Sequence, residues 1–212
     1  MPSFSRIVAG LLDVLAPPGC AACDAPSRAP FCETCGALPA PPTVHQLDDV
    51  PLVVAGLYAP PLSTAITRFK YEGRPELARS LAALLRPALA QAPLPSDATL
   101  VPVPLHPRRL ATRGYNQAAL LAQELGQSCG LGCEPRLLRR ARETEHQVGK
   151  SRTLRLTNAR GAFQLRGSGP ARVVLVDDVV TTGSTVRACA QALTAGGAEL
   201  VAIVALARAV AV

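Results

Sequence analysis

The sequence has few aromatic residues and no run of apolar residues long enough for a membrane-spanning helix. Of its 212 residues 3% are aromatic and none is tryptophan, whereas 49% are hydrophobic, so we expect a core of leucine, valine and alanine. A membrane span requires roughly 20 uninterrupted apolar residues. The apolar segment Ile7–Ala16 is short and is interrupted by Asp13, and it predicts an amphipathic helix rather than a signal peptide. We therefore expect a cytoplasmic protein, in which cysteines remain reduced.

Lysine is scarce too, and arginine supplies almost all of the positive charge. The chain has 22 basic residues, of which two, Lys70 and Lys150, are lysines, and its net charge is +7. Residues 106–166 hold twelve basic residues against four acidic ones, so this segment carries more net positive charge than the whole chain. A solvated, arginine-rich surface would explain the excess, and so would an anionic partner such as pyrophosphate or nucleic acid.

Four of the seven cysteines form two C-x-x-C pairs near the N-terminus. Two such pairs can supply four thiolates to a tetrahedral zinc ion, and Gly36 after the second pair suits the tight turn that directs backbone N–H groups at sulfur. Two disulfides or a redox-active pair are the alternatives, but a reducing compartment and the lack of a preceding βαβ pattern disfavour both. We therefore predict a structural zinc site formed by Cys20, Cys23, Cys32 and Cys35. Cys189 is expected in the core, and no role follows for Cys129 or Cys133.

From Leu52 onward, expected strands alternate with expected helices. This alternation indicates an α/β fold with a mainly parallel sheet and helices on both of its faces. We predict two parts: residues 1–50, with an N-terminal helix, the four-cysteine module and a proline-rich linker at 38–51, and residues 51–212, with the sheet. The expected elements are Leu52–Tyr58, Thr64–Tyr71 capped by Ser63, a helix from Glu76 limited by Pro87, a short or edge strand near 100–104, Gln117–Gln127 capped by Asn116, Arg136–Arg140, Ala162–Arg166, Val173–Val176 with a helix after it, and Leu200–Ala207.

The most informative stretch is Val173–Thr185, with the sequence VVLVDDVVTTGST. Four apolar residues indicate a strand buried on both faces, and Asp177 and Asp178 stand where that strand is expected to end. The small residues Thr181–Thr185 lead into a helix, whose exposed N–H groups suit a phosphate. Carboxylates beside such a loop suit sugar hydroxyls or a divalent metal, so the stretch predicts a ribose-phosphate site; a plain buried strand with two surface acids is the alternative. The lysine of a Walker loop and the G-x-G-x-x-G of a dinucleotide fold are both missing.

Two basic segments indicate the same kind of ligand. Arg108 and Arg109 lie in a loop expected before the helix that Asn116 caps, and arginine side chains hold phosphate oxygens through paired hydrogen bonds. Residues 141–160 are polar without a clear apolar period, and a loop this long in a compact domain is commonly functional or disordered. Lys150 and Arg152 within it predict a lid that closes over a polyanion.

Val173–Thr185 resembles the signature with which type I phosphoribosyltransferases bind phosphoribosyl pyrophosphate (PRPP). Four more motifs occur in order along nearly the whole chain: the four-cysteine unit, FKYEGR, VPVPLHPRRLATRGYNQ and the segment from Thr144 to Phe163. Together they resemble the ComF family, in which a zinc-ribbon-like module is joined to a type I phosphoribosyltransferase domain. The resemblance implies that domain for residues 51–212.

The resemblance also implies a role for each candidate site residue. Asp177 and Asp178 would accept hydrogen bonds from ribose hydroxyls, directly or through waters of a Mg²⁺ that bridges ribose and pyrophosphate. Arg108 and Arg109 would face the pyrophosphate. The 5′-phosphate would be held by Thr181, Thr182, Gly183, Ser184 and Thr185. Catalysis in such transferases depends on stabilised leaving-group charge more than on a protein nucleophile, and the sequence shows no nucleophile–base pair.

Two hypotheses about function stay open. The ComF family is associated with natural transformation, which implies a PRPP-binding protein that takes part in uptake or processing of single-stranded DNA with other proteins of the competence machinery. The alternative is an enzyme that transfers phosphoribose to a nucleobase or another acceptor. An aromatic-rich segment for stacking a nucleobase is not evident, since the tyrosines are limited to Tyr58, Tyr71 and Tyr115.

Overall fold

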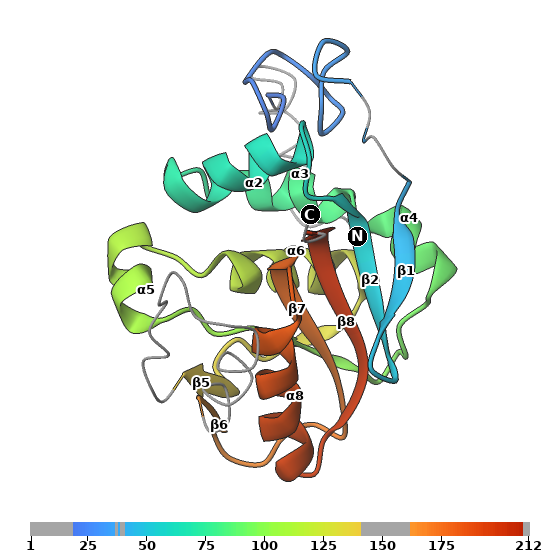
Figure 1. Ribbon diagram of the computed structural model, residues 1–212, viewed down its shortest axis with the longest axis vertical. Coiled ribbons are helices and arrows are strands. Elements are labelled where there is room, and N and C mark those ends of the chain that lie inside the picture. The colour runs from blue at the N-terminus through green and yellow to red at the C-terminus, as the bar shows by residue number, and fades with distance from the viewer. Residues whose placement is uncertain (1–18, 37, 39–40, 141–161, 210–212) are drawn as a thin grey trace, which may run out of the picture.

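The computed structural model describes residues 19–36, 38, 41–140 and 162–209 (Figure 1). The helix expected at Ile7–Ala16 and the lid residues Lys150 and Arg152 lie outside the described residues. Within the described ranges, no helix combines the length and the apolar composition that crossing a membrane requires.

The main sheet of the described chain has six strands in the order β1-β2-β8-β7-β3-β4. The first two strands form an antiparallel hairpin, and every other neighbouring pair is parallel. The prediction of a mainly parallel sheet is therefore confirmed. The strands are β1 (Thr43–Leu47), β2 (Val50–Leu57), β3 (Thr99–Pro102), β4 (Gly132–Cys133), β7 (Arg172–Val180) and β8 (Glu199–Arg208), and a separate antiparallel pair consists of β5 (Leu138–Arg140) and β6 (Phe163–Leu165).

Helices cover both faces of the sheet, as the alternation of elements predicts (Figure 1). They are α2 (Leu62–Tyr71), α3 (Leu77–Ala83), α4 (Arg86–Gln91), α5 (Pro107–Arg113), α6 (Gln117–Cys129) and α8 (Ser184–Ala195). Side chains alternate between the faces of a strand, and β7 divides its residues accordingly. Val174 and Val176 pack in the core with α2, α3, α4 and α6, whereas Val173 and Leu175 pack in the core with α8, β5 and β6.

Local signals account for several element ends. The Asn116 side chain accepts a hydrogen bond from Ala118 N at 3.0 Å and so caps α6, as expected. The same side chain donates to Val103 O at 3.1 Å, which ties the start of α6 to the segment after β3. Pro87 lies in the first turn of α4, where its missing N–H costs little, so α3 and α4 are separate helices.

The proline-containing strand β3 is short, as predicted, but it lies inside the sheet. It pairs with β7 from Thr99 to Pro102, whereas β4 pairs only with Thr99 and Leu100. Pro102 therefore has no paired residue on the β4 side. The nitrogen of proline has no hydrogen to donate, so no hydrogen bond is lost on that side.

The prediction of a linker at residues 38–51 is wrong for Thr43–Leu47, which forms strand β1. This strand is at the edge of the sheet, and its alternate residues are only partly buried. The hydrophobic pattern is accordingly weak, and the flanking prolines and the acids of the hairpin turn dominate the segment. The sheet thus begins before residue 51.

Three smaller expectations also differ from the structure. Ser63 is not a cap, since α2 begins at Leu62 after Pro61 without a capping side chain. The basic segment after β3 is helix α5 rather than a loop, because His106 caps its start and Gly114, with φ +84°, ends it. Finally, β7 does not end before the acid pair but continues to Val180, paired with β8.

Candidate functional site

The continuation of β7 through the acid pair decides where Asp178 lies. Strand alternation directs it to the same face as Val174 and Val176, where α2 packs. There Lys70 Nζ lies 3.0 Å from Asp178 Oδ1, and the two side chains are 17% and 5% exposed. The other carboxylate oxygen, Oδ2, is buried without a hydrogen-bond partner among the described residues. Asp178 therefore has one oxygen paired with lysine and a second, buried oxygen without a partner among the described residues.

Asp177 lies toward the opposite face, where α8 packs. Its Oδ1 accepts a hydrogen bond from Asp178 N at 2.8 Å. Burial, and then the charge of Asp178, raise the pKa of Asp177 to about 8. Burial, and then the Asp177 charge, also raise the pKa of the Cys189 thiol on α8. A positive charge bound near Asp177 would oppose both effects and favour its ionised form.

The predicted phosphate loop lies between β7 and α8, where it was expected. Thr181 and Thr182 are exposed, and Thr182 Oγ1 donates to Ser184 Oγ at 3.2 Å. Gly183 is the residue before α8 and has φ +75°, a backbone conformation that residues with a side chain rarely adopt. A Cβ at this position would also lie 2.9 Å from both terminal carbons of Leu47. The first turn of α8 has N–H groups without helical partners, so the loop and helix form an anion-binding geometry.

Arg187 braces this loop from the first turn of α8. Its Nη1 donates to Thr182 O at 2.7 Å, and its Nε and Nη2 donate to the two carboxylate oxygens of Asp48 at 2.8 and 3.2 Å. The Arg187 hydrogen bonds lower the pKa of Asp48. The turn between β1 and β2 is thereby attached to the phosphate loop. From the sequence, no role was predicted for Asp48 or Arg187. Asp48 belonged to the expected linker.

Arg108 and Arg109 lie on α5, which follows the carboxyl end of β3, the neighbour of β7 in the sheet. None of the residues of α5 is buried. Arg113, the last residue of this helix, lies with its Cζ 5.1 Å from the ring centroid of Tyr71, a side chain that belongs to α2. Tyr71 is 72% exposed. The structure thus assembles arginines and one exposed aromatic ring next to the end of α2 that carries Lys70.

The four predicted metal ligands converge. The Sγ atoms of Cys20, Cys23, Cys32 and Cys35 all lie within 4.8 Å of one another, and those of Cys23 and Cys32 are 3.6 Å apart. A tetrahedral zinc ion with Zn–S bonds of about 2.3 Å separates its sulfurs by about 3.8 Å, so the cluster fits such an ion. All seven cysteines are free thiols, which excludes the two disulfides in this structure.

Backbone N–H groups lower the pKa of Cys20 and Cys32, whereas contacts with the Cys23 and Cys20 thiols raise the pKa of Cys35 to about 12. Burial raises the pKa of the Cys20 thiol, but hydrogen bonds from the backbone N–H groups of Cys32, Ala22 and Cys23 together outweigh burial and lower the pKa to about 6. Gly36 has φ +74° after Cys35, which agrees with the tight turn expected there. Cys189 is buried in the core as predicted, and Cys129 is exposed at the end of α6.

Residues 110–211 match the family model described as "Phosphoribosyl transferase domain". "DNA utilization protein YhgH" of Salmonella typhi is 37% identical over 194 residues, which are 89% of this chain and 83% of the relative. "Competence protein F" of Haemophilus influenzae is 38% identical over 166 residues, 74% of this chain and 72% of the relative. "Competence protein ComFC" of Streptococcus pneumoniae is 30% identical over 143 residues, 67% and 61% of the two chains.

Fold, loop and family match together define a protein with a phosphoribosyltransferase domain and a four-cysteine cluster near its N-terminus. The relatives make the assignment more specific. The chain belongs to the ComF family, and the resemblance inferred from its motifs is confirmed.

The raised pKa of Asp177 leads to a prediction about stability and pH. The folded protein retains a proton on Asp177 that the unfolded chain releases above about pH 4, so the free energy of unfolding should fall as pH rises toward 8. Asp177→Asn keeps the oxygen that accepts from Asp178 N but cannot ionise. Between pH 5 and pH 8, we expect the wild type to lose at least about 1 kcal/mol relative to the variant in urea unfolding. Parallel pH profiles of the two proteins would contradict the assignment.

Proposed function

We propose that this protein binds PRPP and acts in the uptake or processing of single-stranded DNA during natural transformation. The observation that carries the proposal is the junction of β7 and α8. There Asp178, which is paired with Lys70, is followed in the chain by a glycine-containing loop at the N-terminus of a helix. Relatives named for competence and for DNA utilization support the cellular role. Proteins of the competence machinery are its expected partners, and the cytoplasm is its expected location.

Each part of the ligand has a complementary group in this arrangement. Thr181–Thr185 would hold the 5′-phosphate through backbone N–H groups and hydroxyls. Asp177 and Asp178 would accept hydrogen bonds from the ribose hydroxyls, and the buried Oδ2 of Asp178 is an oxygen that needs such a donor. Mg²⁺ would bind with the pyrophosphate and supply positive charge to it; the carboxylates suit a cation that prefers oxygen. We assign Arg108 and Arg109 to the pyrophosphate, and Lys150 and Arg152 to the lid.

The four-cysteine module would hold a structural zinc ion. Its four thiols fill all positions of a tetrahedral site, so such a zinc ion has no open position for catalysis. The module is short and has little core of its own, so metal binding would contribute much of the free energy that folds it.

Binding of PRPP depends on the conformation of Gly183 in this proposal. Gly183→Ala should weaken PRPP binding in the presence of Mg²⁺ about tenfold or more, because alanine at φ +75° is strained and its Cβ meets Leu47. Isothermal titration calorimetry measures the affinity. Gly167→Ala is the matched control, since Gly167 also has φ +75° but its Cβ would meet open space. A wild-type protein that fails to bind PRPP overturns the proposal. Pyrophosphate release with one member of a nucleobase panel would favour the transferase alternative.

The arginines of α5 provide the test of DNA binding. Arg109→Gln and Arg113→Gln should each weaken binding of a single-stranded oligonucleotide and reduce its salt-dependence slope by about 0.7, if each contacts one phosphate. Fluorescence anisotropy at several salt concentrations measures both quantities. Arg172→Gln is the control, because Arg172 pairs with Asp97 and Glu199 at the amino end of β7. Absence of binding by the wild type even at low salt would refute a direct DNA contact.

The metal assignment can be tested by elemental analysis. Purified protein should contain about one zinc ion per chain, and the double substitution Cys20→Ser and Cys35→Ser should lose it. Cys129→Ser, which changes an exposed cysteine on α6, should leave the zinc content unchanged. Metal-free protein with disulfides among Cys20, Cys23, Cys32 and Cys35 would show that the module is oxidised instead.

A further inference from the structure

We propose that the four-cysteine module positions Lys70 against Asp178 through a joint formed by Asp24 and Arg68, and so couples metal binding in the module to ligand binding at the ribose-phosphate site. The inference rests on the proposed function for the identity of the metal and of the ligand. The contacts that carry it belong to described residues of the module, of α2 and of β7.

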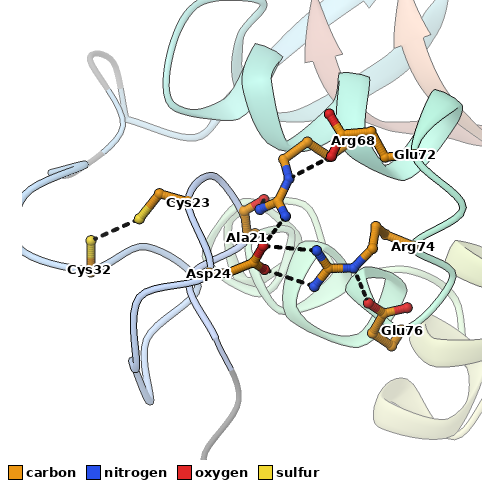
Figure 2. Close-up of polar contacts among 8 residues, drawn as sticks. All are labelled: Ala21, Cys23, Asp24, Cys32, Arg68, Glu72, Arg74 and Glu76. Atoms are coloured by element: carbon orange, nitrogen blue, oxygen red, sulfur yellow. Dashed lines mark hydrogen bonds and ion pairs between the residues drawn. The ribbon is translucent and has the colours of Figure 1, made fainter.

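The joint is centred on Arg68, a largely buried arginine of α2 (Figure 2). Its side chain is 10% exposed and forms an ion pair with Asp24 of the module. Nη1 donates to the backbone oxygen of Ala21 at 3.2 Å, and Nε donates to Glu72 Oε2 at 3.0 Å. A buried guanidinium that loses such partners keeps an uncompensated charge, which is strongly destabilising. Arg68 therefore fixes α2 relative to the module.

Asp24 receives a second arginine at the same carboxylate. Arg74, beyond the end of α2, donates to Asp24 Oδ1 at 2.8 Å and to Oδ2 at 3.0 Å. The hydrogen bonds from Arg74 and Arg68 hold the pKa of Asp24 well below its ordinary value. Figure 2 shows both guanidinium groups pointing at this one side chain. Asp24 thus pairs with two arginines, one near the carboxyl end of α2 and one just beyond it.

The backbone of Asp24 belongs to the first cysteine turn. Asp24 follows Cys23 directly and has φ +64°, just as Gly36 follows Cys35 with φ +74°. Asp24 N donates to Cys20 O at 2.9 Å and Gly36 N donates to Cys32 O at 3.0 Å, so both residues close the turns of the C-x-x-C pairs. A metal ion that holds Cys23 in place therefore also holds the Asp24 carboxylate in reach of α2.

α2 carries the effect from the module to the acid pair. Arg68 and Lys70 are two residues apart, or roughly 200° around the helix, so their side chains lie on opposite sides of it. Phe69 between them is fully buried in the core. Lys70 Nζ lies 3.0 Å from Asp178 Oδ1 on the sheet side. A shift of α2 that follows loss of the joint would move Lys70 away from Asp178.

The test uses Asp24→Asn in the full chain. Asparagine tolerates the left-handed backbone and leaves all four thiols in place, so zinc content should remain at about one ion per chain. Asp97→Asn is the matched control, because it removes an exposed carboxylate from the pair with Arg172 at the amino end of β7. Metal-stripped wild type is a second perturbation of the same joint.

The first readout needs no ligand. An amine-reactive ester labels Lys70 and Lys150, the two lysines of the chain, and peptide mass spectrometry gives their rates, with Lys150 as the internal reference. Asp24→Asn should label Lys70 about threefold faster than the wild type, because the lysine is released from Asp178. Asp97→Asn should label at the wild-type rate. Unchanged Lys70 labelling in Asp24→Asn, with zinc retained, overturns the coupling.

The second readout is PRPP affinity in a double-mutant cycle. Asp24→Asn should weaken binding about fivefold in the wild-type background and have little further effect in a Lys70→Met background, since the effect passes through Lys70. Equal effects in the two backgrounds overturn the proposed route. If the wild type does not bind PRPP at all, the proposed function fails, whereas the labelling rates still decide whether the module positions Lys70.

Discussion

Lys70 and Asp178 form an ion pair with both side chains largely buried, and such a pair is favourable only where the surrounding structure holds the two charges in place. The requirement applies to both elements that meet there. β7 must continue beyond its apolar residues so that alternation directs Asp178 toward α2, and α2 must lie close to that end of the strand. The Arg68–Asp24 pair holds α2, and the contacts of Arg187 with Asp48 and with Thr182 O hold the loop before α8.

The two helices beside the acid pair are held by the same kind of contact. Asp24 receives Arg68 from α2, and Asp48 receives Arg187 from α8. Among the described non-glycine residues, these two aspartates are the ones with positive φ, +64° and +54°. Each lies in a tight turn of the N-terminal part, where aspartate tolerates the left-handed conformation. The cysteine module and the β1–β2 hairpin therefore attach to opposite sides of the site by equivalent arginine–aspartate pairs.

Much of the fold and of the candidate site could be predicted, because the signals are local. The apolar run of β7, the small residues before α8 and the Asn116 cap all act within a few residues of themselves. The four cysteines could be assigned from their spacing alone, and the sulfur positions agree with it. The predictions failed where the apolar pattern of a strand is weak and the strand is formed by pairing with a neighbouring strand. Strand β1 was missed because an edge strand needs only partial burial. The extension of β7 was missed because Asp177 and Asp178 are polar, although this part of the strand still pairs with β8.

By itself, the sequence determined the class of fold, the four-cysteine module, the small-residue loop between β7 and α8, and the family, because each depends on residue types at short, regular spacings. Tertiary structure alone decided which charges meet. Arg68 and Asp24 are 44 residues apart, and Arg187 and Asp48 are 139 apart. Lys70 likewise reaches Asp178 only because strand order brings α2 to the end of β7. Arginine, lysine and aspartate are common on any surface, so no local pattern distinguishes these partners from solvated charges before the chain has folded.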